Sequence, residues 1–341
     1  MPLSVLTHLI IILISTVSPS ELPNEEESTP SLQNDAESPD FWGHWGDGNA
    51  EISGYALQYP RYGQVREGTA VTIFVTEDFA ESVKVKHEDP TRDRSDVHPV
   101  MKLNWIQDFP TGVYDYSLMT SAFVNLTKHQ SLSRGAPTKI SFSSQEWCGH
   151  VYAQLAFDKE RTLFTSHSYF DGEADEERSL PPRDSRGLAE DTVLLWARGF
   201  AGPRLDRGDS KKISVLRSLE KSRLLHVFLE WTPATATRSA QPIEIEVPAG
   251  KFEVDLYTLA IAASPAAKSY PIGATIELPA STWTIEVESA WPHRIIRWSR
   301  SDGLKAELVG SERLAYWRMN GPGFESALEK IGLQARPPRT P

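Results

Sequence analysis

The sequence predicts a mainly β protein with curved antiparallel sheet or sheets, half-barrel or sandwich-like, and few short helices. Runs rich in β-branched and aromatic residues recur along the chain, and clusters of Gly, Pro and Asp bound them. In "MKLNWI" (101–106), Met101, Leu103 and Trp105 fall opposite the residues between them, as one buried strand face requires. Short strands joined by turns favour this class over a parallel βαβ fold.

Composition and charge set limits on function. The chain has 341 residues, of which 40% are hydrophobic and 24% are charged, an ordinary balance for globular domains. Its formal charge of −11 is concentrated in residues 21–40, which carry −7, and residues 171–177, which carry −5. The remainder is close to neutral and has no basic stripe to neutralise phosphates. Nucleic acid is therefore not expected as a partner.

The N-terminus reads as an export signal. Residues 1–20 hold a short apolar run followed by Ser18-Pro19-Ser20, which is typical of a cleaved signal peptide and too short to span a bilayer. An uncleaved segment that tethers the chain to a membrane is the alternative. We therefore expect a secreted or periplasmic protein, with no transmembrane domain beyond this segment. Residues 21–40 are acidic and almost without apolar residues, which predicts a disordered spacer.

Residues 41–170 are expected to form a β-rich N-terminal module. An acidic, proline-containing loop over 171–190 then interrupts the pattern, either as a domain boundary or as a surface loop within one sheet. The predicted strands of this module lie within residues 70–79, 99–109, 112–126, 138–147 and 150–157.

Residues 191–335 are expected to form a second β-rich module, followed by a tail over 336–341. Residues 189–200 and 324–333 have the spacing of short helices, whereas "RLLHVFLEW" (223–231) is among the runs predicted as strands. Gly250 in "VPAGKF" and Gly303 in "SDG" predict hairpin turns, because glycine tolerates unusual dihedral angles.

Three stretches of the N-terminal module carry a family resemblance: "FVTEDF" (74–79), "MKLNWIQDFPTGVYDYSLMTSAF" (101–123) and "SSQEWCGHVYAQL" (143–155). They closely resemble a family of uncharacterised secreted bacterial proteins and lipoproteins, some of which are labelled "septum formation inhibitor Maf". True Maf proteins are cytosolic nucleotide pyrophosphatases with an N-terminal Ser/Pro/Arg-rich phosphate motif. This chain lacks that motif, so the resemblance implies export and no pyrophosphatase activity. It also lacks the cysteine that anchors many of those relatives to lipid.

The C-terminal module carries a second resemblance. "IEIEVPAGKFEVDLYTL" (243–259) and "PHRIIRWSRSDGLKAELVGSERLAYW" (292–317) resemble periplasmic proteins with a VPAG motif. That group is similar to the outer-membrane lipoprotein carriers, in which a curved antiparallel sheet wraps as a half-barrel around an apolar concavity. The resemblance implies such a half-barrel here, without naming a ligand.

"EWCGH" holds the single cysteine of the chain. On a strand, Glu146, Cys148 and His150 share one face, which could serve thiol chemistry or contribute to a metal site. A structural zinc site requires four ligands, and no second cysteine or nearby histidine pair is available to complete the four. Free cysteine is among the most often buried residue types. We therefore interpret Cys148 as a small packed residue within a strand.

Other candidates for chemistry are weaker. Glu77 and Asp78, with Glu146, are the carboxylates to test first for acid–base roles, although a charged strand end is the simpler interpretation. The chain has no nucleophile elbow, phosphate loop, dinucleotide fingerprint or zinc-protease motif. No cofactor and no metal ligand are predicted.

The favoured function is a non-enzymatic binding module of the cell envelope. An apolar or aromatic-lined concavity would take a lipid, a lipoprotein acyl chain or a polysaccharide. One alternative is a thiol- or metal-dependent hydrolase that uses Glu146, Cys148 and His150. The other is a protein-interaction module, in which the acidic residues 171–177 and neighbouring sheet edges bind a partner chain.

Overall fold

Alternation of apolar side chains builds the central strands, as predicted. Met101, Leu103 and Trp105 are 0%, 0% and 3% exposed and point into the core. The computed structural model describes residues 36, 39–130, 132–182, 187–270 and 274–335. The predicted signal peptide, the predicted tail and all of the predicted spacer except Ala36, Pro39 and Asp40 lie outside these residues.

The first run of antiparallel strands comes from the N-terminal half of the chain. Its order is β1–β2–β4–β5–β6–β7–β8–β9, and the two-residue β3 pairs with the end of β2. The strands are β1 (Ala50–Arg61), β2 (Gln64–Ala80), β3 (Val85–Lys86), β4 (Val97–Pro110), β5 (Asp115–Asn125), β6 (Pro137–Glu146), β7 (Gly149–Phe157), β8 (Thr162–Ser168) and β9 (Glu176–Leu180).

The second run comes from the C-terminal half. Its order is β10–β11–β12–β14–β17–β18–β19, with β13 paired to the first part of β14. The strands are β10 (Gly187–Ala189), β11 (Ser210–Leu216), β12 (Trp231–Arg238), β13 (Ile243–Val247), β14 (Gly250–Ile261), β17 (Ser281–Glu288), β18 (Ile295–Arg300) and β19 (Lys305–Leu314). β15 (Ser264–Ser269) and β16 (Ala274–Leu278) form a separate hairpin.

The two runs are one continuous sheet. β1 pairs with β2 on one side and with β19 on the other, so the predicted N- and C-terminal modules share hydrogen-bonded strands. In the described part of the chain this sheet has 17 strands and is not closed. The predicted class, a curved, mainly antiparallel β fold with few short helices, is therefore confirmed.

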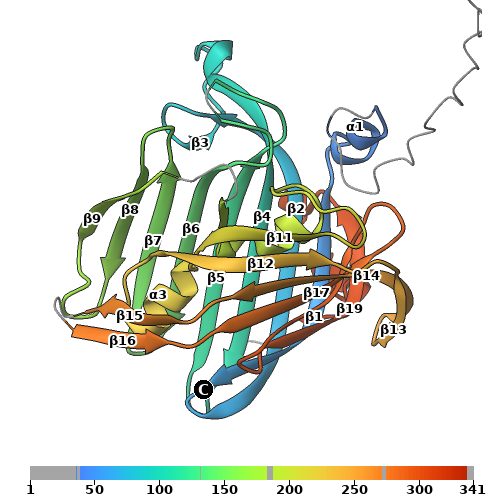
Figure 1. Cartoon of the computed structure of the whole chain (residues 1–341). Coiled ribbons are helices and arrows are strands. Elements are labelled where there is room, and N and C mark those ends of the chain that lie inside the picture. The colour runs from blue at the N-terminus through green and yellow to red at the C-terminus, as the bar shows by residue number, and fades with distance from the viewer. Residues whose placement is uncertain (1–35, 37–38, 131, 183–186, 271–273, 336–341) are drawn as a thin grey trace, which may run out of the picture. The chain divides into compact units, whose positions relative to one another are not determined.

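The sheet folds over so that its two runs face each other. In Figure 1 the strands of the second run cross in front of the long strands β4 to β8. The ring of Trp105 on β4 lies 5.9 Å from that of Trp283 on β17 and 5.6 Å from that of Trp298 on β18. These three indoles, all 3% exposed or less, belong to one apolar cluster with side chains from both runs.

The short helix α2 (Val193–Ala197) lies between the two runs, in the main apolar cluster. Residues Val193–Ala197 are all buried, and the indole of Trp196 lies 5.6 Å from the ring of Tyr257 on β14. The concave side, where the half-barrel resemblance implied a ligand, is thus packed with the chain's own residues. The helices are α1 (Pro39–Trp45), α2 (Val193–Ala197), α3 (Leu219–Leu225) and α4 (Ala327–Lys330), with 3₁₀ turns η1 (Arg94–Asp96), η2 (Glu190–Thr192), η3 (Tyr316–Arg318) and η4 (Phe324–Ser326).

Most local predictions hold, and one is wrong. Gly250 and Gly303 have φ angles of 127° and 101° at the β13–β14 and β18–β19 hairpins, as expected. The segment predicted as a strand over 223–231 instead holds the end of α3 and an irregular stretch before β12. Ser218 caps this helix just before its first residue, Leu219: its hydroxyl accepts a hydrogen bond from the Lys221 amide, so an N-cap outweighs the β-prone apolar run.

The charged segment over residues 171–190 holds secondary structure of its own. β9 lies within it, and β10 begins at Gly187.

No helix among the described residues has the length and apolarity needed to cross a bilayer.

Candidate functional site

Cys148 does not lie in a strand. It follows Trp147 in the tight turn between β6 and β7, where Glu146 is paired with Gly149, and it is exposed. The prediction of a packed, filler cysteine is therefore wrong. The turn also breaks the alternation that would have placed Glu146, Cys148 and His150 on one strand face.

The Glu146 carboxylate supports this turn instead of activating the thiol. Its Oε2 accepts a hydrogen bond of 2.7 Å from the Cys148 amide, and its Oε1 lies 3.8 Å from Nη2 of Arg223. Interaction with this carboxylate raises the pKa of the Cys148 thiol, the opposite of what a cysteine nucleophile requires. Among the described residues no hydrogen bond joins His150 to either of the other two.

The other carboxylates proposed for testing are not brought together. Glu77 binds Lys102 at 3.1 Å, and Asp78 lies 3.8 Å from Arg94. The strand register places Glu146 near the start of β2, whereas Glu77 lies close to its end. At about 3.3 Å per residue the separation exceeds roughly 20 Å, far beyond the reach of a shared acid–base pair.

The acidic segment 171–177 is engaged with the rest of the chain. Glu173 is paired with His226, and Asp175 lies 2.7 Å from Nδ1 of His167. Glu176 accepts hydrogen bonds from Arg178 and Tyr270. This internal pairing weakens the case for the segment as a free docking surface for a partner chain.

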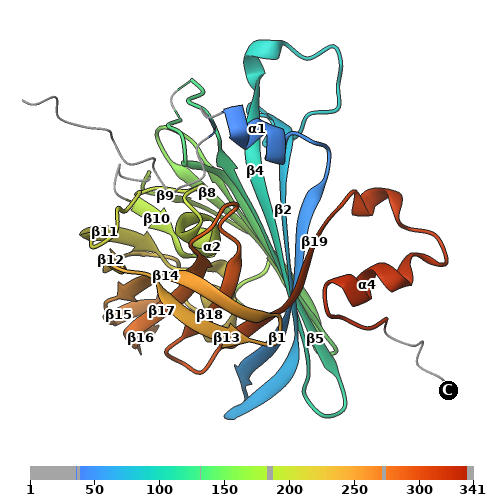
Figure 2. The same cartoon turned by 90° about the vertical axis from the view of Figure 1, so that its right-hand side faces the viewer.

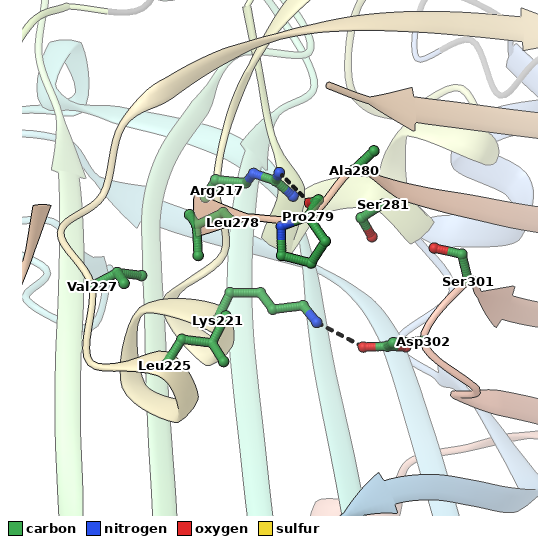
Figure 3. A pocket seen from close by; sticks show the side chains of 10 residues that line it. All are labelled: Arg217, Lys221, Leu225, Val227, Leu278, Pro279, Ala280, Ser281, Ser301 and Asp302. Carbon is green, nitrogen blue, oxygen red and sulfur yellow. Dashed lines mark hydrogen bonds and ion pairs between the residues drawn. The ribbon is translucent and has the colours of Figure 1, made fainter. Parts of the chain in front are cut away.

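A pocket of about 180 Å³ opens beside α3, and it is the best candidate for a ligand site (Figure 3). Three segments that are distant in sequence form its walls. They are residues 217–227, which include α3; residues 278–281, at the turn from β16 to β17; and residues 301–302, at the β18–β19 hairpin.

The floor of this pocket is apolar. Val227 and Leu278 are 1% and 4% exposed, and together with Ala267 they form a small cluster separate from the main core. Leu225 and Pro279 add further apolar surface. A cavity of about 150 Å³ is known to hold a benzene molecule, so this one suits an apolar group of about six carbon atoms.

Two buried donors at the pocket lack hydrogen-bond partners among the described residues. Ser281 is 7% exposed, and its hydroxyl makes no hydrogen bond. Arg217 is 4% exposed; its Nη2 donates to the carbonyls of Ala262 and Pro279 at 3.0 and 3.3 Å, but its Nε has no partner. A buried donor without an acceptor costs about 1–3 kcal/mol, which a ligand oxygen would recover if it entered far enough to reach these enclosed atoms.

The charged groups at the mouth are already satisfied. Nζ of Lys221 donates to Asp302 at 2.7 Å, and Nε of Arg300 binds both oxygens of the same carboxylate. Burial opposes ionisation of Asp302, but the charge of Arg300 and these hydrogen bonds outweigh it and hold the pKa of this carboxyl well below its usual range. Arg300 continues into the interior, where it binds the buried Glu220.

The pocket can therefore hold a small apolar group that carries one oxygen acceptor. No histidine or carboxylate makes a hydrogen bond to Ser281 that would activate it as a nucleophile. Within the ranges that the structure describes, no group of His, Cys, Asp and Glu side chains is placed to hold a metal ion.

Sequence reasoning did not find this pocket. The "SDG" turn placed Ser301 and Asp302 at a hairpin, but nothing indicated that they face Lys221 and Ser281. The pairing of β17 with β18 brings Ser281 close to Ser301, and the contact between Lys221 and Asp302 joins α3 to this hairpin.

Comparison with known proteins identifies a structural neighbour but no family for this chain. No family model and no curated protein matches the chain. Among solved structures, it is similar to a β-barrel-like protein of domain of unknown function DUF1849 from Brucella abortus. The TM-score is 0.42 and the identity 9%, and the match covers 78% of this chain and 98% of the other.

Proposed function

We propose that this chain is a non-enzymatic binding protein of the cell envelope, secreted or periplasmic, that holds an apolar ligand with a carbonyl or ester oxygen in the pocket beside α3. The observation that carries the proposal is the combination of an apolar floor with two unpartnered buried donors, Ser281 Oγ and Arg217 Nε. An acyl ester of a lipid or lipoprotein offers both an apolar chain and an acceptor. A polysaccharide would need many more polar partners than this pocket has.

The proposed location has separate support. The apolar run in residues 1–20 and the resemblance of three stretches to secreted bacterial proteins both favour export. The thiol hydrolase is not proposed, because Glu146 raises the pKa of the Cys148 thiol and His150 makes no hydrogen bond to it among the described residues.

The proposal is tested with methyl hexanoate, whose chain length matches the pocket, titrated into the full chain and followed by NMR chemical shifts. Ser281→Ala should weaken binding about fivefold, since one hydrogen bond contributes about 1 kcal/mol. It should not lower the melting temperature of the free protein, because this hydroxyl has no partner there.

Ser301→Ala is the matched control from the same pocket. The Ser301 hydroxyl already accepts a hydrogen bond from the Thr282 amide, so its loss should reduce stability and leave affinity unchanged. Equal affinity of wild type and Ser281→Ala would refute the proposed contact. Absence of any shift at the pocket residues would refute the site.

A further inference from the structure

A second apolar surface lies on the outer side of the sheet, away from the pocket beside α3. The segment 315–335, here called the C-terminal strap, contains η3, η4 and α4. Figure 2 shows α4 beside β19 on the side away from β14 and β17. Ile331 of the strap clusters with Ile52, Val75 and neighbouring apolar residues of β1 and β2.

The strap touches the sheet closely at one end. Gly54 on β1 and Gly310 on β19 are paired across the two strands, and the backbone of Ile331 lies directly over them. A Cβ on Gly54 would lie 2.2 Å from the Ile331 carbonyl oxygen, and one on Gly310 would lie 2.7 Å from its carbonyl carbon. Only glycine at positions 54 and 310 leaves room for the backbone of the strap over these two strands. At its other end, the strap continues directly from β19.

Between these two attachments, the described residues of the strap are held to the sheet by packing and not by hydrogen bonds. In the described part of the strap, each hydrogen bond joins two strap residues, as in Met319 N to Tyr316 O, Gly323 N to Glu325 Oε2 and Leu333 N to Leu328 O. No ion pair links these described residues to the strands. The middle of the strap can therefore lift without breaking a hydrogen bond to the sheet.

A cavity of about 450 Å³ lies under this part of the strap. Ile52, Val71 and Ile73 line it from the sheet, and Met319, Phe324 and Leu328 line it from the strap. Its volume is within the range of small-molecule sites. Scaled from benzene in about 150 Å³, it has room for up to about eighteen carbon atoms, so a chain of about twelve carbon atoms fits.

The polar groups at this cavity select against an anion. Tyr316, Asn320 and Glu325 are its polar lining residues, and no Lys or Arg lines it. One oxygen of the Glu325 carboxylate accepts a hydrogen bond of 2.6 Å from the Gly323 amide and stays fixed there. A ligand carboxylate would meet this like charge without a compensating cation, whereas a hydroxyl could donate to it.

We propose that the cavity between the C-terminal strap and strands β1 and β2 is a second ligand site, which takes a single acyl chain with an uncharged hydroxyl-bearing head. The strap acts as its lid. This site is separate from the pocket beside α3. The proposal for it rests on how the strap is attached to the sheet and on the residues that line the cavity.

The test uses N-phenyl-1-naphthylamine, a neutral probe that fluoresces in apolar sites, with monolaurin and laurate as competitors of equal chain length. Monolaurin should displace the probe at a concentration at least tenfold lower than laurate. Glu325→Gln should narrow this preference to about threefold or less, because the amide keeps an oxygen for Gly323 and removes the charge. An unchanged preference in Glu325→Gln would overturn the assignment of an uncharged head.

Val71→Trp fills the cavity from the sheet and should weaken probe binding at least tenfold. Val65→Trp is the control: it lies on the same strand, is 57% exposed and does not line the cavity, so binding should be unchanged. Phe324→Ala changes the strap side at an exposed position and should weaken binding several-fold, even if Val71→Trp fails to fold.

Ser281→Ala separates the two proposed sites and should leave displacement by monolaurin unchanged. Monolaurin should also slow hydrogen exchange of the amides of residues 316–333, as a lid closed on its ligand requires. Wild-type binding in both Val71→Trp and Phe324→Ala, or binding that Ser281→Ala abolishes, would overturn the second site.

Discussion

At the scale of single residues, the environment of Cys148 shows how a turn sets thiol chemistry. The side chain is exposed, yet the carboxylate of Glu146 beside it disfavours the thiolate and raises the thiol pKa. Accessibility and reactivity therefore differ at this position, because the thiolate is the nucleophile in both labelling and catalysis.

Labelling of the native chain with a disulfide reagent should modify one thiol per molecule, at a slower rate than a free cysteine at pH 7. Glu146→Gln should accelerate the reaction severalfold, because it removes the neighbouring charge. Cys148→Ser should change the free energy of unfolding by no more than about 0.5 kcal/mol, as for other surface positions. A thiol that reacts only after denaturation would contradict this assignment.

The sequence could not have shown this environment. The residues between β6 and β7 are Trp147 and Cys148, neither of which is a turn-forming type, so Cys148 was interpreted as part of a strand although the predicted strand runs 138–147 and 150–157 end on either side of it. The side chain of Tyr169 packs over Gly149 and leaves no room for a Cβ, which is a contact between separate hairpins. The hairpins at Gly250 and Gly303 were predictable because their glycines carry the signal locally.

At the scale of elements, α3 depends on carboxylates supplied from elsewhere in the chain. Asp191 accepts a hydrogen bond from the Leu219 amide at 3.1 Å, and Glu190 accepts from the Ser218 amide at 3.1 Å. Both carboxyl groups come from η2, 28 residues earlier. The apolar run after Arg223 is visible in the local sequence and predicted a strand there. The contacts of Glu190 and Asp191 with the start of the helix join distant residues, so the local sequence could not reveal them.

Burial, with smaller contributions from the charges of Glu190 and Glu220, raises the pKa of Asp191 well above its ordinary value. A raised carboxyl pKa means that the folded state holds its proton more tightly than the unfolded chain does. Its contribution to stability is therefore complete below the unfolded pKa of about 3.9 and is lost as the pH rises through the folded pKa.

Asp191→Asn keeps an oxygen acceptor for Leu219 and removes this titration. Relative to wild type, its free energy of unfolding should rise by about 1.4 kcal/mol for each pH unit between the unfolded and folded pKa values of Asp191. Urea unfolding at pH 4, 5, 6 and 7 measures the trend, with the exposed Glu160→Gln as control. A constant difference across these pH values would show that Asp191 is ionised in the folded chain.

At the scale of the whole molecule, one sheet joins the N- and C-terminal halves of the chain, which the sequence patterns had indicated as separate modules. β1 lies between β2 and β19, and the buried Arg198 beyond α2 binds Glu51 on β1 through two hydrogen bonds of 2.6 and 3.1 Å. The strands themselves were predictable from alternation. Their pairing across the chain, and with it the pocket beside α3, depends on long-range register that no local pattern carries.

The predicted N-terminal module (41–170), extended through the following loop to residue 190, and the predicted C-terminal module (191–335) should not fold when produced alone. Without the second half, β1 loses its partner β19 and Trp105 loses the indoles that cover it. The full chain should unfold in one cooperative step, with fluorescence and circular dichroism transitions that coincide. A fragment 41–190 with a sharp melting transition of its own would contradict this view.

The two ends of the open sheet, β9 and β10, bear on how the chain meets other molecules. β10 has only three residues, all buried, and β9 has five, among them Glu176, Glu177 and Arg178. Short, covered or charged borders are how β proteins prevent the addition of a foreign strand. Such borders make this chain a poor template for fibrils or domain exchange, although the main sheet is open in the part of the chain that the structure describes.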